Sequence, residues 1–94
     1  MGACEALQRV YIRLQRCRAT PCLAIDDFYT LVVIAGNVEA NDSELGVMLK
    51  ALAKVYSHPH YLEELVDELL ARKPIALGVL ERAMEALGCT SEGA

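Results

Sequence analysis

Residues 28–36, FYTLVVIAG, decide whether the chain contains a buried strand or is helical throughout. Their β-branched and aromatic side chains suit a strand as well as a buried helix, and periodicity does not separate the two in short apolar runs. The apolar pattern extends from about Leu23 to Val38, which is long for a strand, and no other segment offers a pairing strand. Asp26 and Asp27 lie near its start, where a helix dipole favours acidic residues. We therefore predict a helix over residues 23–38, with a buried strand as the alternative.

A helix is also predicted on the N-terminal side, over residues 3–18. Its apolar residues follow one helical stripe, and they are Leu7, Val10, Tyr11, Leu14 and Cys17. Pro21 disfavours helical geometry at Thr20 and suits the first turn of a new helix. The first helix is therefore expected to end before these two residues.

Two further helices are predicted after residue 40. Asn41 and Glu44 have the spacing of a capping box, so the third helix should begin at Asn41 and end near Ser57. Pro59 suits the first turn of a fourth helix, which Pro74 would end at Lys73. Apolar residues cover one half of the wheel of this fourth helix, and they are Tyr61, Leu62, Leu65, Val66, Leu69 and Leu70.

The fifth predicted helix runs from Ile75 to Leu87, with Gly88 at its C-terminal cap. Its apolar residues cover roughly 200° of the helical wheel, against about 100° for a surface helix, so we expect burial on more than one side. The small and polar residues 89–94 are expected to form a flexible tail. Together these patterns predict an all-α fold, a compact single domain of about five short antiparallel helices over residues 1–88.

Charge is distributed unevenly along the chain. Nine Lys and Arg against thirteen Asp and Glu give a net charge of -4, which repels polyanions. The basic residues gather on the first helix, where Arg9, Arg13 and Arg16 share one face with Ile12 beside them. The fourth helix carries an acidic face opposite its apolar half, and this face consists of Glu63, Glu64, Asp67 and Glu68.

The cysteines and the flanking sequence bear on location. No apolar leader precedes Arg9, and no apolar run approaches the ~20 residues of a membrane span, so we predict a cytoplasmic chain without membrane contact. The thiols of Cys4, Cys17, Cys22 and Cys89 are then expected to be reduced, unless the source is a hyperthermophile. A disulfide between Cys17 and Cys22 is the alternative. Low Asn and Gln content would suit a heat-adapted source.

The sequence contains no motif for catalysis or for a cofactor. His58 and His60 flank Pro59, which is a weak metal signal because the proline turns the two rings apart, and capping of a helix N-terminus explains them better. The cysteine spacing contains no CxxC zinc framework. No nucleophile has a general base at motif spacing. We expect neither a metal site nor a cofactor, and a protein that is not an enzyme.

Hydrophobic content indicates a protein that binds other proteins. Apolar residues make up 54% of the 94 residues, and the mean hydropathy is +0.27. A domain of this length buries only about 60–65% of the surface that its unfolded chain exposes, so apolar area should remain outside or meet a partner. We therefore predict a non-catalytic interaction or assembly subunit, either a homo-oligomer or part of a larger complex. The basic face of the first helix and the acidic face of the fourth would pair within the bundle or between copies.

The alternative function is that of a small nucleic-acid-binding accessory subunit. Arg9, Arg13 and Arg16 would contact phosphates, although three such contacts give only weak, salt-sensitive binding. In size and helical build the chain resembles the small helical subunits of multi-subunit ribonucleoprotein effectors, an analogy of architecture without a shared motif. The third and fourth helices do not read as a helix-turn-helix, because acidic residues cover the face that would meet DNA. A small regulator of an enzyme or polymerase would have the same sequence features.

Overall fold

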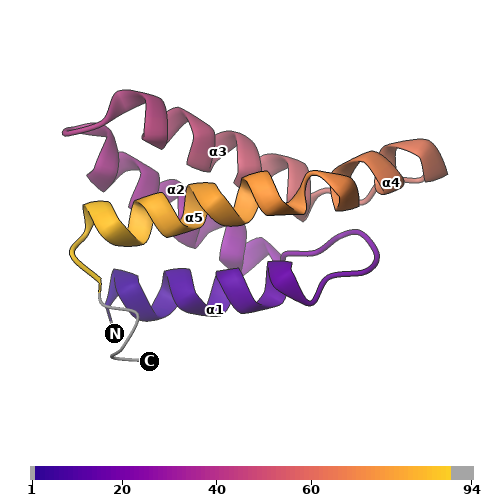
Figure 1. The fold of residues 1–94 in the computed structure, drawn as a ribbon, viewed down its shortest axis with the longest axis horizontal. Coiled ribbons are helices and arrows are strands. Elements are labelled where there is room, and N and C mark those ends of the chain that lie inside the picture. The colour runs from indigo at the N-terminus through magenta and orange to yellow at the C-terminus, as the bar shows by residue number, and fades with distance from the viewer. Residues whose placement is uncertain (1, 90–94) are drawn as a thin grey trace.

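The computed structural model describes residues 2–89, and this part of the chain contains five helices and no strand (Figure 1). The helices are α1 (Ala3–Gln15), α2 (Ile25–Glu39), α3 (Ser43–Ser57), α4 (Glu63–Ala71) and α5 (Lys73–Ala86). The predicted all-α bundle is therefore confirmed. The stretch that was ambiguous between helix and strand is helical from Ile25 onward.

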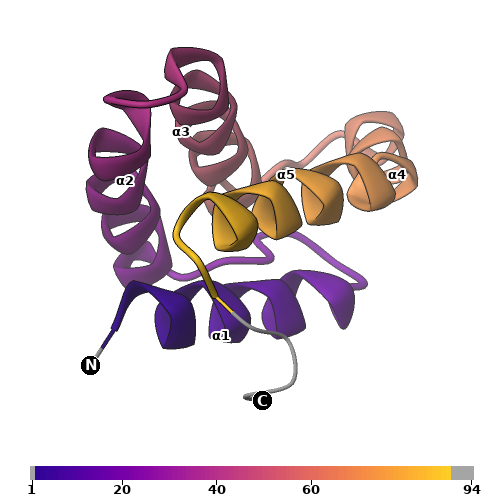
Figure 2. The same cartoon turned by 60° about the vertical axis from the view of Figure 1, so that its left-hand side comes forward.

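The helices α2 and α3 form an antiparallel pair with the most extensive packing in the bundle. A Cβ atom at Gly46 would lie 2.9 Å from the Cβ of Glu39, so the glycine allows this close approach. α5 runs through the middle and packs against α1, α3 and α4 (Figures 1 and 2). The radius of gyration, 12.7 Å, is that of one compact domain of this length.

The core is built by four of the five helices, namely α1, α2, α3 and α5. Its most deeply buried large side chains are Leu7, Val10, Leu14, Leu31, Leu45, Leu49 and Leu80. α5 packs against α1, α3 and α4, and Ile75 is exposed. The buried residues of α5 follow a single stripe, namely Ala76, Val79, Leu80 and Ala83, so burial on more than one side is not confirmed. α4 contributes no fully buried residue, and its Leu69 packs against the core. Its C-terminal end lies against α5, and the rest extends from the bundle.

Four helix starts differ from those predicted. α2 begins at Ile25 rather than Leu23, and α5 begins at Lys73 rather than Ile75. The N-cap of α3 is Asp42 rather than Asn41, and Asp42 Oδ1 accepts a hydrogen bond of 3.1 Å from the backbone N–H of Leu45. α4 begins at Glu63 rather than Pro59, because residue 60 is bound to the loop after α1. The backbone N–H of His60 donates to Thr20 Oγ1 at 3.3 Å, and the Thr20 hydroxyl donates to His60 O at 3.5 Å. The predicted role of Gly88 is confirmed by its φ of +74°.

All four cysteines are paired, in the disulfides Cys4–Cys89 and Cys17–Cys22. The expectation of reduced thiols is therefore wrong, and the alternative Cys17–Cys22 bond is confirmed. The Cα atoms of the two pairs lie 5.6 Å and 5.4 Å apart, within the usual range for disulfides. Cys89, predicted to begin a flexible tail, is bonded to the start of α1, and its N–H donates to Met84 O at 2.8 Å. The rest of that predicted tail, residues 90–94, lies outside the described residues.

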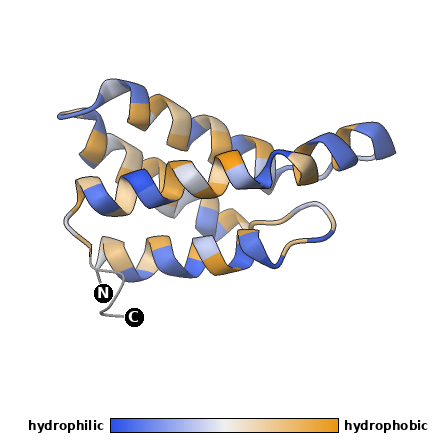
Figure 3. Cartoon of the chain, in the orientation of Figure 1, coloured by the Kyte–Doolittle hydropathy of each residue, from blue (hydrophilic) through white to orange (hydrophobic). Residues whose placement is uncertain are grey.

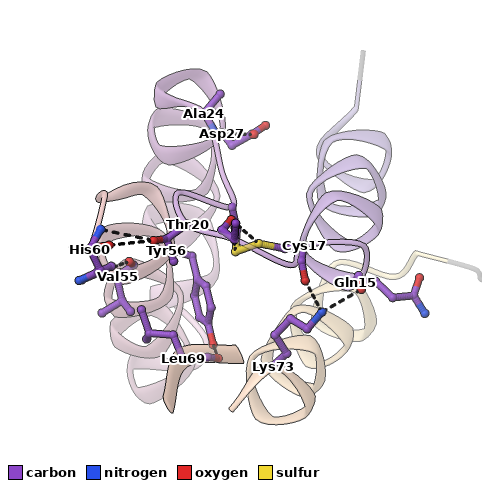
Figure 4. The surroundings of a disulfide bond; sticks show 12 residues. Gln15, Cys17, Thr20, Ala24, Asp27, Val55, Tyr56, His60, Leu69 and Lys73 are labelled. Carbon is purple, nitrogen blue, oxygen red and sulfur yellow. Dashed lines mark hydrogen bonds between the residues drawn. A yellow bond between two sulfur atoms is a disulfide. The ribbon is translucent and has the colours of Figure 1, made fainter. Parts of the chain in front are cut away.

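Tyr56 and Lys73 connect the helices around the Cys17–Cys22 bond (Figure 4). The Tyr56 carbonyl accepts from the backbone N–H groups of Cys22 and Leu23, while its hydroxyl donates to Leu69 O at 2.7 Å. Lys73 Nζ donates to the carbonyls of Gln15 at 3.1 Å and Cys17 at 2.6 Å. The ammonium thus binds the C-terminal end of α1, where a helix dipole favours positive charge.

Tyr56→Phe is expected to lower the free energy of unfolding at pH 7 by about 1 kcal/mol, because the hydroxyl's hydrogen bond to Leu69 is lost. Burial raises the pKa of Tyr56 above its usual 10.0, so folding favours the neutral phenol. The contribution of the neutral Tyr56 phenol to the free energy of unfolding is complete below pH 10 and is lost as the pH rises through the raised pKa. Urea unfolding of both proteins should therefore show a difference that shrinks above pH 10. Tyr61→Phe, at an exposed tyrosine, is the control and should change nothing.

Candidate interaction surfaces

The predicted basic face of α1 is divided by an ion pair with α2. Arg9 and Arg16 are exposed, but Arg13 Nη1 donates to Asp27 Oδ2 at 2.6 Å. Asp27 is 4% exposed, and the same oxygen accepts from the backbone N–H of Ala24 at 3.0 Å. Within residues 2–89, Asp27 is the one charged side chain that is buried. Arg13 therefore stabilises the fold. Two of the three arginines, Arg9 and Arg16, remain free to bind a ligand.

The predicted acidic face lies on α4, and all four of its members are exposed, namely Glu63, Glu64, Asp67 and Glu68. Glu68 Oε1 pairs with Arg72 Nη2 at 2.8 Å, one helical turn away. The structure does not bring this face to α1. Within residues 2–89 the ion pairs are Arg13–Asp27, Lys50–Glu39, Arg72–Glu68 and Arg82–Asp42. Pairing of the two faces between copies stays a prediction.

Apolar side chains beside the acidic face of α4 are also exposed. Tyr61 is 92% exposed, Leu62 66% and Leu65 43%. α4 packs mainly against the beginning of α5, and hydrophilic and hydrophobic residues alternate along it in Figure 3. The amphipathic pattern of this helix is thus real. The N-terminal part of its apolar half faces solvent, whereas Leu69 packs against the core.

A second exposed apolar surface lies on α2, and the sequence pattern did not indicate it. Ile25, Tyr29 and Val33 follow one another at four-residue spacing and are 67%, 60% and 65% exposed. Gly36 and Ala40, both exposed, continue the same line. These five residues are called the α2 stripe below. α2 is apolar over most of its circumference, so its sequence offers little contrast to identify the outward face.

Two hollows interrupt the surface. A cavity of 440 Å³ lies beside the Cys4–Cys89 bond and is lined in part by Tyr11, Glu81 and Glu85. The Tyr11 hydroxyl donates to Glu81 Oε2 at 3.0 Å, and this bond, with some burial and the carboxylate's charge, raises the pKa of Tyr11. A raised pKa keeps the phenol protonated and makes it a poor nucleophile, while the oxidised cysteines are not thiolates. Among residues 2–89, the lining of this cavity therefore pairs no activated nucleophile with a base.

The second hollow, of 200 Å³, lies at the N-terminal end of the α2 stripe. Its lining includes Ile25, Phe28 and Tyr29 from α2 together with Ser57 and His58 from the end of α3. Most of this lining is apolar, and it continues the exposed surface of α2 toward α3. It therefore enlarges the apolar surface available for contact with another molecule.

Neither a metal cluster nor a membrane span was found in the part of the chain that the structure describes. No three His, Cys, Asp or Glu side chains gather there as metal ligands. The ring Nε2 of His60 lies 3.0 Å from Val55 O, while His58 is exposed. No helix in that part is long and apolar enough to cross a membrane. Comparisons of the chain with protein-family models, curated proteins and solved structures found no match in any of the three.

Proposed function

We propose that this chain is a non-catalytic interaction or assembly subunit, self-associating or bound to a larger protein. The observation that supports it is the exposure of apolar side chains in two places, above all Tyr29 and Val33 on α2 and Leu62 at the N-cap of α4. Soluble monomers rarely expose contiguous apolar patches beyond a few hundred Å², and larger patches mark contact surfaces. Apolar contact would supply the affinity of such a complex.

The charged faces would orient the partners rather than hold them together. Arg9 and Arg16 on α1, and the acidic residues of α4, are exposed and so available between molecules. Exposed charges steer association and fix register while contributing little net affinity. We therefore propose that the pairing of the basic face with the acidic face occurs between molecules.

The nucleic-acid alternative has less support, because its central residue is engaged elsewhere. Arg13 is bound to Asp27, so only Arg9 and Arg16 of the predicted contacts remain free for phosphates. Two contacts and a net charge of -4 favour at most weak binding that salt abolishes. Gel-shift titration with single-stranded and duplex RNA and DNA would revive this alternative if a shift depended on Arg16.

The disulfides bear on the predicted cytoplasmic location. Two bonds that leave no free cysteine are typical of oxidising compartments, and also of intracellular proteins of hyperthermophiles. We infer that the chain works in one of these two settings. A reducing cytosol of a mesophile would open both bonds and is the least supported location.

Light scattering at about 0.1 M salt is expected to give the mass of a dimer or a larger assembly. Raising the salt to about 1 M should leave the assembly intact if apolar contact holds it, since screening weakens only the charge pairs. Dissociation by salt would instead assign the affinity to the charged faces. A monomer at every concentration and at both salt levels would contradict self-association.

A further inference from the structure

We propose that the α2 stripe is the surface that binds a second copy of this chain. The two α2 helices would pack antiparallel about a twofold axis near Val33. This inference rests on the proposed function and specifies its partner. By helical geometry the five stripe residues fall within about 80° of the wheel and extend about 22 Å along the helix. They form one continuous, straight surface that another helix can follow.

The charge of the surface favours a copy of itself. A twofold contact places the same patch on both molecules, so a patch of one sign would repel itself. The stripe contains no charged residue. Asp26 lies on one edge, and Glu39 lies on the other, where Lys50 of α3 pairs with it at 3.0 Å. If the basic face of α1 or the acidic face of α4 instead contacted its own copy across the twofold axis, like charges would be brought together.

The order of residue sizes favours the antiparallel direction. Ile25 and Tyr29 are bulky and occupy the N-terminal half of the stripe, whereas Gly36 and Ala40 occupy its C-terminal half. Antiparallel pairing sets each bulky residue against a small one and leaves Val33 at the centre. Parallel pairing would place the bulky residues of one helix against the same bulky residues of the other. The helix dipoles also oppose one another in the antiparallel arrangement.

Gly36 has an unusual position that this pairing explains. It lies inside α2, where glycine weakens a helix relative to alanine, and a Cβ there would meet nothing within 4 Å. The fold of one chain therefore does not require a glycine. Packing of Tyr29 from the second copy against position 36 does require a glycine, because the missing side chain lets the two helices approach.

The surface around the stripe adds area to the proposed contact. A standard interface buries about 800 Å² on each partner, more than one helical stripe offers. α3, which packs beside α2, exposes Val47 and Ala51. The hollow of 200 Å³ next to Tyr29 lies at the end of α2 that would meet the partner's Ala40. The face thus extends over both helices.

The test is sedimentation equilibrium of the whole chain from micromolar to millimolar concentration, with matched charge variants. Val33→Glu should weaken dimerisation by about a hundredfold or more, because it places two carboxylates at the centre of an apolar contact. Ile75→Glu changes a similarly exposed side chain on α5, 71% against 65% exposed, and should leave the dimer intact. Circular dichroism should show both variants folded.

Two further comparisons fix the geometry. Val33→Glu and Val33→Lys should each be monomeric, and a mixture of them should recover a dimer, because the two residues at position 33 meet near the axis. Gly36→Leu should weaken dimerisation at least about tenfold by filling the space that Tyr29 of the second copy uses. Gly78→Leu is the control, since Gly78 of α5 also has nothing within 4 Å of its Cβ position.

The outcomes separate this inference from the proposed function. A wild-type dimer that Val33→Glu and Gly36→Leu leave intact overturns the α2 pairing, while the assembly function stands. Dissociation by both charge variants of Val33 without recovery in their mixture overturns the antiparallel register. A wild-type chain that is monomeric up to millimolar concentration overturns the dimer and self-association together, and assigns the stripe to a different protein.

Discussion

Replacing Cys4 and Cys89 by serine is expected to lower the free energy of unfolding by roughly 4–5 kcal/mol. The two cysteines are 85 positions apart, so their bond closes almost the whole chain into a loop and removes much of the conformational entropy of the unfolded state. For a domain of this length the corresponding fall in melting temperature is about 20–35 °C. Thermal unfolding followed by circular dichroism measures it directly.

The second disulfide supplies an internal comparison. Cys17 and Cys22 are 5 positions apart, and the same loop-closure argument gives only about 2 kcal/mol for replacing both by serine. Mass spectrometry with an alkylating reagent should find no free thiol in the wild-type protein. Four alkylated thiols, or a Cys4/Cys89 variant that melts no lower than the Cys17/Cys22 variant, would contradict this account.

Most of the fold was predictable from sequence because it depends on local patterns. The stripe containing Leu7, Val10 and Leu14, together with the stop at Pro21, locates α1 to within a few residues. The start of α4 was not predictable, because it depends on hydrogen bonds between His60 and Thr20, which are 40 positions apart. The Cys4–Cys89 bond was missed for the same reason, since spacing in sequence contains no signal for a contact between two chain ends.

The interaction surfaces were only partly predictable. The acidic face of α4 lies where its helical spacing placed it, but the pattern could not reveal that the apolar half with Leu62 and Leu65 is also exposed. Periodicity shows that a helix has two faces and not whether a neighbour covers one of them. On α2 the opposite problem arises, because the exposed Val33 differs little in hydropathy from the buried Leu31 and Ile34. Tertiary packing alone decides which of these residues is outside.

Arg13→Ala is expected to lower the free energy of unfolding by about 2–3 kcal/mol, because it leaves the buried carboxylate of Asp27 without its cationic partner. The figure lies at the low end for buried pairs since the Arg13 side chain is 47% exposed and partly screened. Arg16→Ala, on the same helix and exposed, is the control and should stay within about 0.5 kcal/mol of wild type. Denaturation by urea gives both values.

The Arg13–Asp27 ion pair also determines how a nucleic-acid-binding experiment on α1 must be designed. A loss of binding after Arg13→Glu would have two explanations, since the variant also places a second carboxylate against Asp27 and so destabilises the fold. Arg16→Glu avoids this ambiguity because its side chain lies in solvent. In a double-mutant cycle, the joint replacement of Arg13 and Asp27 by alanine should cost less than the sum of the two single replacements. Additive costs would show that the two side chains do not stabilise one another, and would return Arg13 to the set of residues free for a ligand.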